Sequence, residues 1–250
     1  MANFDLSDRV AVVTGGSRGL GRDMVFGLAE AGADVVVASR KLENCEEVAK
    51  EVEAATGKRA LPVACHVGHW DDLEGLVNAV YDHFGKVDVL VNNAGMSPLY
   101  PDVASVTEEL WDKTLAVNLK GPFRLAALMG TRMVQSGNGG SIINVSSIGS
   151  LRPYGGIVPY AAAKAGLNAM TVAMADALGP TVRVNCIVPG SFRTDVVQHW
   201  DEATLRAAAE HPALKRIGEP DEVVGAVLYF ASDASSYTTG ALLRIDGGAV

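Results

Sequence analysis

Two side chains that could move a proton stand four residues apart, at Tyr160 and Lys164. The alanine-rich segment after Pro159 predicts a helix, in which residues at positions i and i+4 lie on the same face. A nearby ammonium favours the phenolate and lowers the pKa of a tyrosine, which titrates near pH ~10 in water. Tyr160 is therefore a candidate general acid or base.

A hydroxyl that could serve the same reaction comes thirteen residues before Tyr160, at Ser147. It lies just after the apolar run 142–145, which predicts a strand, so it would sit at the carboxyl end of that strand. There it could donate a hydrogen bond to a developing oxyanion. A Tyr-x-x-x-Lys pair also occurs by chance on helix surfaces, so this interpretation depends on the rest of the chain.

A glycine-rich loop offers a site for a phosphate group. The sequence TGGSRGLG follows the apolar run 10–13 and precedes a segment with helical spacing that ends at Ala31. Gly15, Gly19 and Gly21 would let the backbone approach a pyrophosphate, and a helix N-terminus favours anions. The spacing is G-x-x-x-G-x-G rather than the commoner G-x-G-x-x-G, and the loop alone could be a tight turn.

The end of the second expected strand bears on which nucleotide could bind. In dinucleotide-binding folds an acidic residue there accepts hydrogen bonds from the ribose and would repel a 2′-phosphate. This chain has Ser39 and Arg40 instead, and a hydroxyl and a guanidinium both suit phosphate. Arg18 in the glycine loop would face the same place. We therefore predict NADP(H) as the cofactor, the alternative being that Arg40 and Lys41 are solvated residues before the next helix.

Strand and helix patterns alternate along the chain. This alternation predicts right-handed βαβ units and a doubly wound α/β fold, with a parallel sheet of about seven strands and helices on both faces. We expect one domain over residues 1–250, with a mobile substrate lid at about 191–214, where periodicity is weak. Strands are expected at 10–13, 34–38, 60–64, 87–91, 142–145, 182–188 and 241–245, and later helices at 42–55, 70–84, 107–118, 122–135, 160–178 and 219–230.

Composition and charge argue against several functions. The 250 residues carry a formal net charge of −8, which disfavours binding to nucleic acid or to an anionic membrane. The three cysteines are widely spaced without a C-x-x-C pair, so neither a disulfide framework nor a metal site is expected. We see no targeting segment and no uninterrupted apolar run of membrane-spanning length, and expect a cytoplasmic protein.

Two expected helices, 122–135 and 160–178, carry only two charged residues each. A helix that is apolar on nearly every side is buried on more than one side. We therefore expect a homo-oligomer, either a tetramer or a dimer. The alternative is an alanine-rich surface that tolerates water.

Together these motifs resemble those of the short-chain dehydrogenases/reductases, in their single-domain branch with a Rossmann-type fold. The resemblance covers essentially the whole chain. It rests on TGGSRGLG, on NNAG at 92–95, on Asn118 in LAVNLKG, on the serine, tyrosine and lysine at their intervals, on VRVNCIVPGSFRT at 182–194, and on the closing segment 216–248.

The resemblance implies an NADP(H)-dependent oxidoreductase that transfers a hydride between the nicotinamide and a ketone or secondary alcohol. Tyr160 would exchange a proton with the substrate oxygen, which Ser147 would hold. Lys164 would lower the pKa of Tyr160 and bind the nicotinamide ribose, and Asn118 would hold a water. The implied cofactor contacts are Gly15, Ser17, Arg18, Gly19, Leu20, Gly21, Ser39, Arg40, His66, Val67, Asn93, Ala94, Gly95, Tyr160, Lys164, Pro189, Gly190, Phe192 and Thr194.

His66 departs from the family pattern, which usually has an aspartate near adenine at this place, although Val67 could still contribute its backbone. Some carbonyl-reducing members look similar at this CHVG stretch, which favours carbonyl reduction.

A mostly apolar set of residues is expected to bind a medium-sized apolar carbonyl compound, with a 3-oxoacyl thioester among the options. One alternative is a sugar or polyol dehydrogenase. Another is a non-catalytic NADP(H)-binding redox sensor, but such proteins tend to lose the tyrosine or the lysine. The expected substrate residues are Met96, Ser97, Tyr154, Val196 and Trp200.

Overall fold

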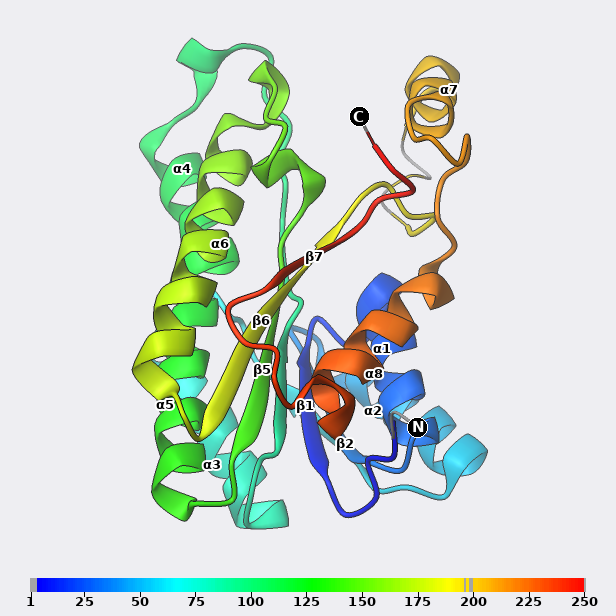
Figure 1. The fold of residues 1–250 in the computed structure, drawn as a ribbon. Coiled ribbons are helices and arrows are strands. Elements are labelled where there is room, and N and C mark those ends of the chain that lie inside the picture. Colours follow the sequence, from blue (N-terminus) through cyan, green and yellow to red (C-terminus); the bar gives the residue numbers. More distant parts are fainter. Residues whose placement is uncertain (1–3, 196, 198–199, 250) are drawn as a thin grey trace.

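Seven parallel strands form one sheet in the computed structural model, which describes residues 4–195, 197 and 200–249 (Figure 1). The strands are β1 (Val10–Thr14), β2 (Asp34–Ser39), β3 (Ala60–Ala64), β4 (Val89–Asn92), β5 (Gly140–Val145), β6 (Val182–Pro189) and β7 (Leu242–Ile245). Their order in the sheet is β3-β2-β1-β4-β5-β6-β7. The connections change direction between β1 and β4, and ligands bind outside the carboxyl ends of strands at such a point.

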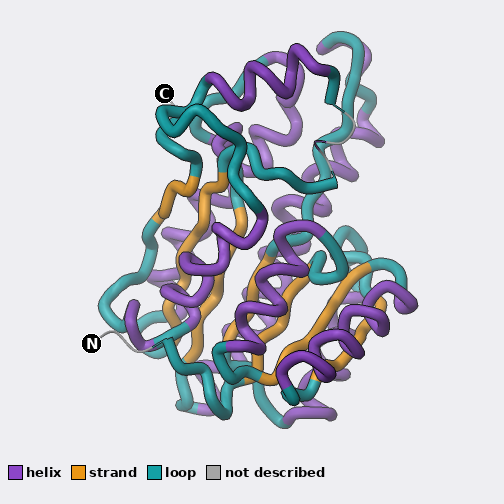
Figure 2. The backbone as a smooth tube through the Cα atoms, turned by 90° about the vertical axis from the view of Figure 1, so that its right-hand side faces the viewer, coloured by secondary structure: helices purple, strands orange, loops and turns teal. Residues whose placement is uncertain are grey.

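Helices cover both faces of this sheet, as predicted. They are α1 (Gly19–Glu30), α2 (Leu42–Thr56), α3 (Asp72–Phe84), α4 (Glu108–Leu115), α5 (Gly121–Ser136), α6 (Val158–Leu178), α7 (Glu202–Glu210) and α8 (Val224–Ala231). Figure 1 places α1, α2 and α8 on one face and α3, α5 and α6 on the other. Figure 2, viewed from the α1 and α8 side, shows helices packed in front of the strands and further chain above them.

Each face of the sheet has its own hydrophobic core, because successive strand residues point to opposite faces. Val13 of β1 packs with Leu28 of α1 and Phe230 of α8 in one core. Val12, the residue before it, packs in the other core, which includes Leu125 of α5. The two cores fix the strands from both sides, so the strand ends that carry the site are held rigidly.

Several boundaries differ from the sequence predictions, for local reasons. The helix expected from residue 70 begins at Asp72. The helix expected at 219–230 begins with a 3₁₀ turn, Pro220–Val223, whose N-terminus is capped by a Glu219/Glu222 capping box. The helix expected at 107–118 is capped by Thr107, but it runs into a π-helical turn, Ala116–Lys120. Such widened turns are frequent at functional sites.

The segment expected as an irregular lid contains a regular helix, α7, whose N-terminus is capped by Asp201. Its base is tied to the end of the chain, since the N–H groups of Ala213 and Leu214 donate to the carbonyls of Gly248 and Gly247 at 3.1 and 3.0 Å. Among the residues that the structure describes, no helix is long and apolar enough to cross a membrane.

Candidate active site

The carboxyl ends of β1 and β4 are joined by a small hydrogen-bond network. Thr14 Oγ1 accepts from the backbone N–H groups of Asn93 and Ala94, both at 3.1 Å. The Asn93 side-chain amide donates to the carbonyls of Thr14 and Gly15 at 2.9 and 3.3 Å. Asn93 and Ala94, two expected cofactor residues, thus brace the glycine loop. Thr14 was missed, although it ends the first apolar run.

The glycine loop forms a cradle that side chains would fill. Gly15 has φ +67°, and a Cβ on it would lie 2.9 Å from Asn93 Nδ2. A Cβ on Gly21 would lie 2.2 Å from the Gly15 carbonyl oxygen. Because α1 begins at Gly19 with no side-chain cap from Arg18, its first N–H groups have no partner within the helix. This cradle suits the pyrophosphate of a dinucleotide. Ser17 is half-buried beside it, and Leu20 packs on the core.

The end of β2 presents the groups expected to select the nucleotide. Ser39 Oγ lies 3.1 Å from the sulfur of the buried Cys45, and Arg40 is exposed next to it. Arg18, which was expected to face the same place, has its Nη1 3.9 Å from a carboxylate oxygen of Asp195. That pair is exposed on both sides and contributes little stability, so it does not fix the guanidinium.

His66 takes the place where an aspartate was expected. Its ring stacks on that of His69, with ring centroids 4.1 Å apart, and its Nδ1 accepts from the N–H of Gly68 at 3.1 Å. Partial burial, then the nearby His69 and Arg40, lowers the pKa of His66, so the ring is neutral at neutral pH. Next to it, the Val67 carbonyl lies 2.0 Å from where a Cβ on Gly121 would stand, which leaves room for glycine alone.

Ser147 and Tyr160 meet at the carboxyl end of β5. Ser147 opens the 3₁₀ turn Ile148–Ser150, and its Oγ accepts from the Gly149 N–H at 3.1 Å. Burial raises the pKa of Tyr160, although the Ser147 hydroxyl nearby acts to lower it. Tyr160 therefore carries its proton at neutral pH.

The pKa of Tyr160 is raised in this structure rather than lowered, because burial outweighs the interactions that oppose it. The two side chains are neighbours, as their spacing predicted, with Lys164 Nζ 5.9 Å from the centre of the tyrosine ring. The ammonium donates to the Val145 carbonyl at 2.7 Å instead. Lys164 is only 3 % exposed, and this burial lowers its own pKa to about 8.

Asn118 lies beside Lys164, on the π-helical turn. Its Nδ2 donates to the carbonyls of Met96 and Thr114 at 2.8 and 2.9 Å, and its Oδ1 accepts from the Met96 N–H at 3.2 Å. A Cβ on Gly95 would lie 3.0 Å from Asn118 Oδ1 and 3.6 Å from Lys164 Nζ. Asn118 thus fixes the segment after β4, and only the second lone pair of Oδ1 remains on its side chain for the expected water.

Comparison with known proteins decides the family. The model of a family described as enoyl-(acyl carrier protein) reductase matches residues 15–250. A short chain dehydrogenase/reductase of Aspergillus oryzae, astE, is 38% identical, covering 98% of this chain and 96% of the relative. The chain is a short-chain dehydrogenase/reductase. Members of this family are oxidoreductases that act on CH–OH and C=O groups and bind NAD(P).

Two further relatives have more specific names. The 3-oxoacyl-[acyl-carrier-protein] reductase FabG of Thermotoga maritima is 37% identical, covering 98% of this chain and 99% of the relative. The crystal structure of an NADPH-dependent 3-quinuclidinone reductase from Rhodotorula rubra is 32% identical, with a TM-score of 0.92, covering 99% of this chain and 93% of that one.

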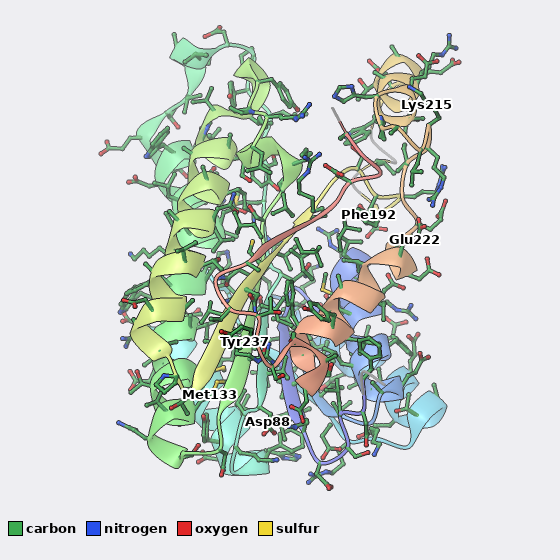
Figure 3. The ribbon with its side chains drawn as sticks, in the orientation of Figure 1. Asp88, Met133, Phe192, Lys215, Glu222 and Tyr237 are labelled. Carbon is green, nitrogen blue, oxygen red and sulfur yellow. The ribbon has the colours of Figure 1, made fainter. Side chains whose placement is uncertain are left out.

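The end of β6 brings four more expected cofactor residues of this family member toward the glycine loop. Pro189 ends the strand, and a Cβ on Gly190 would lie 2.8 Å from Asp246 Cα, so the backbone passes close to the last strand. Phe192 pairs with Gly218, and Figure 3 shows it below α7 and near Glu222. Thr194 lies 3.5 Å from where a Cβ on Gly19 would stand, which brings the segment after β6 close to the glycine loop.

The expected substrate residues are partly brought together. Tyr154 is 65 % exposed and close enough to Tyr160 for its hydroxyl to raise the pKa of Tyr160. Met96 is held by Asn118, and Ser97 follows it on the exposed segment after β4. Trp200 is half-buried ahead of α7, and Val196 lies outside the described residues.

Tyr100 is a residue of this region that the sequence interpretation missed. Its hydroxyl donates to the Gly155 carbonyl at 2.7 Å and accepts from the Val158 N–H at 2.6 Å. It thereby ties the segment after β4 to the turn that opens α6, where Tyr160 lies. The only signal in the sequence is an aromatic residue soon after NNAG.

Proposed function

We propose that this protein reduces a ketone to a secondary alcohol with NADPH, and that Tyr160 is the proton donor. The observation that carries the proposal is that the Ser147 hydroxyl lies close enough to Tyr160 to act on its pKa, with the buried ammonium of Lys164 beside the tyrosine ring. A tyrosine with a raised pKa keeps its proton at neutral pH, which suits a general acid in reduction. The reverse reaction would need the phenolate, so alcohol oxidation would be favoured only at high pH.

The residues around the pair have complementary roles in this proposal. Reduced nicotinamide, when bound, supplies the hydride. Ser147 donates a hydrogen bond to the carbonyl oxygen and Tyr160 delivers a proton to it, while Lys164 binds the nicotinamide ribose and Asn118 retains a water. The glycine loop binds the pyrophosphate through the N-terminus of α1.

In this proposal, the residues at the end of β2 determine the selectivity for NADP(H). Arg40 is exposed beside the Ser39 hydroxyl, and neither carries the negative charge that would repel a 2′-phosphate. The similar reductase from Rhodotorula rubra is described as NADPH-dependent, which supports the same choice.

Changing the end of β2 tests this selectivity. A charge-assisted contact contributes roughly 1.5–3 kcal/mol, so Arg40→Ala should reduce the NADPH preference roughly 10- to 150-fold, mainly through KM. Adding Ser39→Asp should reverse the preference, because a carboxylate repels the 2′-phosphate and accepts from a 2′-hydroxyl. Steady-state kcat/KM for both nucleotides is the measurement, with Lys41→Ala as the matched control. A wild type that favours NADH would overturn the role of Arg40.

The substrate class follows from the apolar character of Met96, Tyr154 and Trp200, and from the ketones named for two relatives. We propose a medium-sized apolar ketone or a 3-oxoacyl thioester. The test is a panel of apolar ketones, acyl thioesters and sugars with NADPH. A strong preference for sugars or polyols would contradict the substrate class. Binding of NADPH without turnover of any carbonyl would favour a redox sensor.

We further propose that residues 1–250 act as a single catalytic domain, with 191–214 as its lid, in a cytoplasmic homo-oligomer. The hydrogen bonds from Ala213 and Leu214 to the last strand's tail support the lid, since they fix one end of it. The three cysteines are free and buried, which is compatible with a reducing compartment. Exposed apolar side chains on α5 and α6, such as Phe123 and Val172, support the oligomer.

A further inference from the structure

A row of polar side chains runs along α6 beyond the two residues that the family motif names. Asn168 follows Lys164 by four residues and Tyr160 by eight, so all three share one face of the helix. Asn168 is only 8 % exposed, and its Nδ2 donates to Ser150 Oγ at 2.8 Å. Neither Asn168 nor Ser150 has a role in the mechanism described above.

Ser150 connects Asn168 to Ser147. Its hydroxyl donates to the Ser147 carbonyl at 2.6 Å, and its backbone N–H donates to the same oxygen at 2.9 Å. With its one proton on the Ser147 carbonyl, Ser150 Oγ accepts from Asn168 Nδ2. It also lies 3.2 Å from Ser146 Oγ, whose own proton the Lys164 carbonyl can accept at the same distance. The hydrogen bonds from Asn168 through Ser150 thus run from α6 to the Ser147 peptide.

The amide of Asn168 is itself oriented from the opposite side. Cys186 Sγ, on β6, lies 3.7 Å from Asn168 Oδ1. Burial raises the pKa of this thiol to about 11, so it stays protonated, and its proton can go weakly to the amide oxygen or to the Ile187 carbonyl at 3.5 Å. With its oxygen toward Cys186, Asn168 presents its NH₂ group to Ser150. The chain Cys186, Asn168, Ser150 and Ser147 is thus consistent in donors and acceptors throughout.

We propose that Asn168 and Ser150 are positioning residues, which hold the Ser147 peptide so that its hydroxyl stays against Tyr160. The inference rests on the proposed function, because this position matters only if Ser147 and Tyr160 act on the substrate. Ser147 needs such support, since it stands between the end of β5 and a 3₁₀ turn of three residues. Small displacements of a reacting group can cost a large factor in rate.

The kinetic test compares Ser150→Ala, Asn168→Ala and Ser150→Thr, which keeps the hydroxyl. The two alanine variants should lower kcat about 10-fold and leave KM for NADPH within about two-fold, because the cofactor residues are untouched. The isotope effect on kcat with NADPH deuterated at the transferred position should rise, since the chemical step becomes slower. Ser150→Thr should recover most of the loss.

Ser141→Ala is the matched control. Ser141 is a buried serine of β5 whose hydroxyl donates to the Phe230 carbonyl at 2.7 Å, at the end of the strand away from Ser147. It should lower thermal stability about as much as Ser150→Ala while kcat and the isotope effect stay at the wild-type values. Equal effects of both variants on kcat would overturn the proposal in favour of a general loss of stability.

Backbone amide hydrogen exchange supplies a readout that needs no turnover. The N–H groups of Gly149 and Ser150 bond to Ser147 Oγ and to the Ser147 carbonyl, so both should exchange faster in Ser150→Ala and Asn168→Ala but not in Ser141→Ala. Unchanged exchange, or faster exchange with unchanged kcat, would overturn the positioning role. A wild type that reduces no carbonyl would overturn the proposed function, and the exchange data would still decide whether Asn168 orders the Ser147 turn.

Discussion

Tyr160 and its neighbours show how the environment of one residue sets its proton affinity. Spacing alone predicted a tyrosine beside an ammonium, and therefore a lowered pKa. The structure adds two facts that spacing cannot carry: Tyr160 is desolvated, and Lys164 donates to the Val145 carbonyl at the end of β5. The pairing was therefore predictable from the sequence, but the direction of the pKa shift was not.

Removing the Tyr160 hydroxyl should abolish most of the activity. Tyr160→Phe should lower kcat by a factor on the order of 10²–10⁴, because proton delivery is lost while the ring remains to pack. The Kd for NADPH should stay within a few-fold of the wild type. Tyr237→Phe, which removes the hydroxyl of a fully exposed tyrosine outside the expected site, is the control and should keep nearly full activity. Normal turnover by Tyr160→Phe would remove Tyr160 from the mechanism.

Lys164 illustrates a functional group retained at a cost in stability. Its pKa falls from 10.5 to about 8, so below pH 8 the folded protein buries an ammonium. A shift of this size corresponds to roughly 3 kcal/mol against folding. Because the folded pKa is the lower one, the penalty is complete below pH 8 and is relieved as the pH rises toward 10.5.

We expect Lys164→Met to be more stable than the wild type and nearly inactive. Without added nucleotide at pH 7 its free energy of unfolding should be about 1–2 kcal/mol higher, since the Val145 carbonyl loses a donor but no charge is buried. This advantage should shrink between pH 8 and 10. Urea unfolding of both proteins across this range is the measurement. A variant less stable than the wild type at pH 7 would show that the ammonium is well compensated.

At the scale of single elements, the sequence predicts best where local signals decide. Apolar runs located all seven strands, and Gly57 and Gly85 end α2 and α3 in the left-handed conformation with no atom within 4 Å of a Cβ there. The π-helical turn that holds Asn118 could not be predicted, because no local signal marks it; it ends at Gly121, which packs against Val67 on another segment. The hydrogen bond from Asn168 to Ser150 could not be predicted from the sequence either.

Gly121→Ala tests that packing. A Cβ there would lie 2.0 Å from the Val67 carbonyl oxygen, so the helix or the segment after β3 must shift. We expect a loss of about 1–3 kcal/mol of stability and a lower kcat through displacement of Asn118. Gly75→Ala is the matched control, because Gly75 lies inside α3 with no atom within 4 Å of its Cβ position. The control should gain up to about 1 kcal/mol, and thermal unfolding of both variants measures the difference.

At the scale of the whole molecule, the sheet order explains why the sequence motifs meet. β1 and β4 are neighbours, as are β4 and β5, so the glycine loop, the NNAG segment and Ser147 emerge side by side although they are far apart in sequence. The alternation of strands and helices predicts a parallel sheet, so it was predictable that these three segments would meet at one edge of it. The helix α7 was not predicted within the segment 191–214, because it is short and none of its residues is buried.

The outer face of α6 carries the last prediction, which concerns assembly. Val172 is 53 % exposed on a helix with two charged residues, and Phe123 is exposed on the neighbouring α5. A second copy of the chain would bury such a face, and a charge placed there would then be desolvated at a cost of several kcal/mol. Val172→Glu should therefore give a smaller species than the wild type in sedimentation velocity.

The matched control for this prediction adds the same charge to another face. Ala54 is exposed on α2, which is already rich in charged residues, so Ala54→Glu should leave the sedimentation coefficient unchanged. Circular dichroism should show both variants folded. A monomeric wild type would contradict this prediction, and so would a Val172→Glu variant with the sedimentation coefficient of the wild type. In either case the α6 face would be exposed to water, and the active site would be formed by one chain alone.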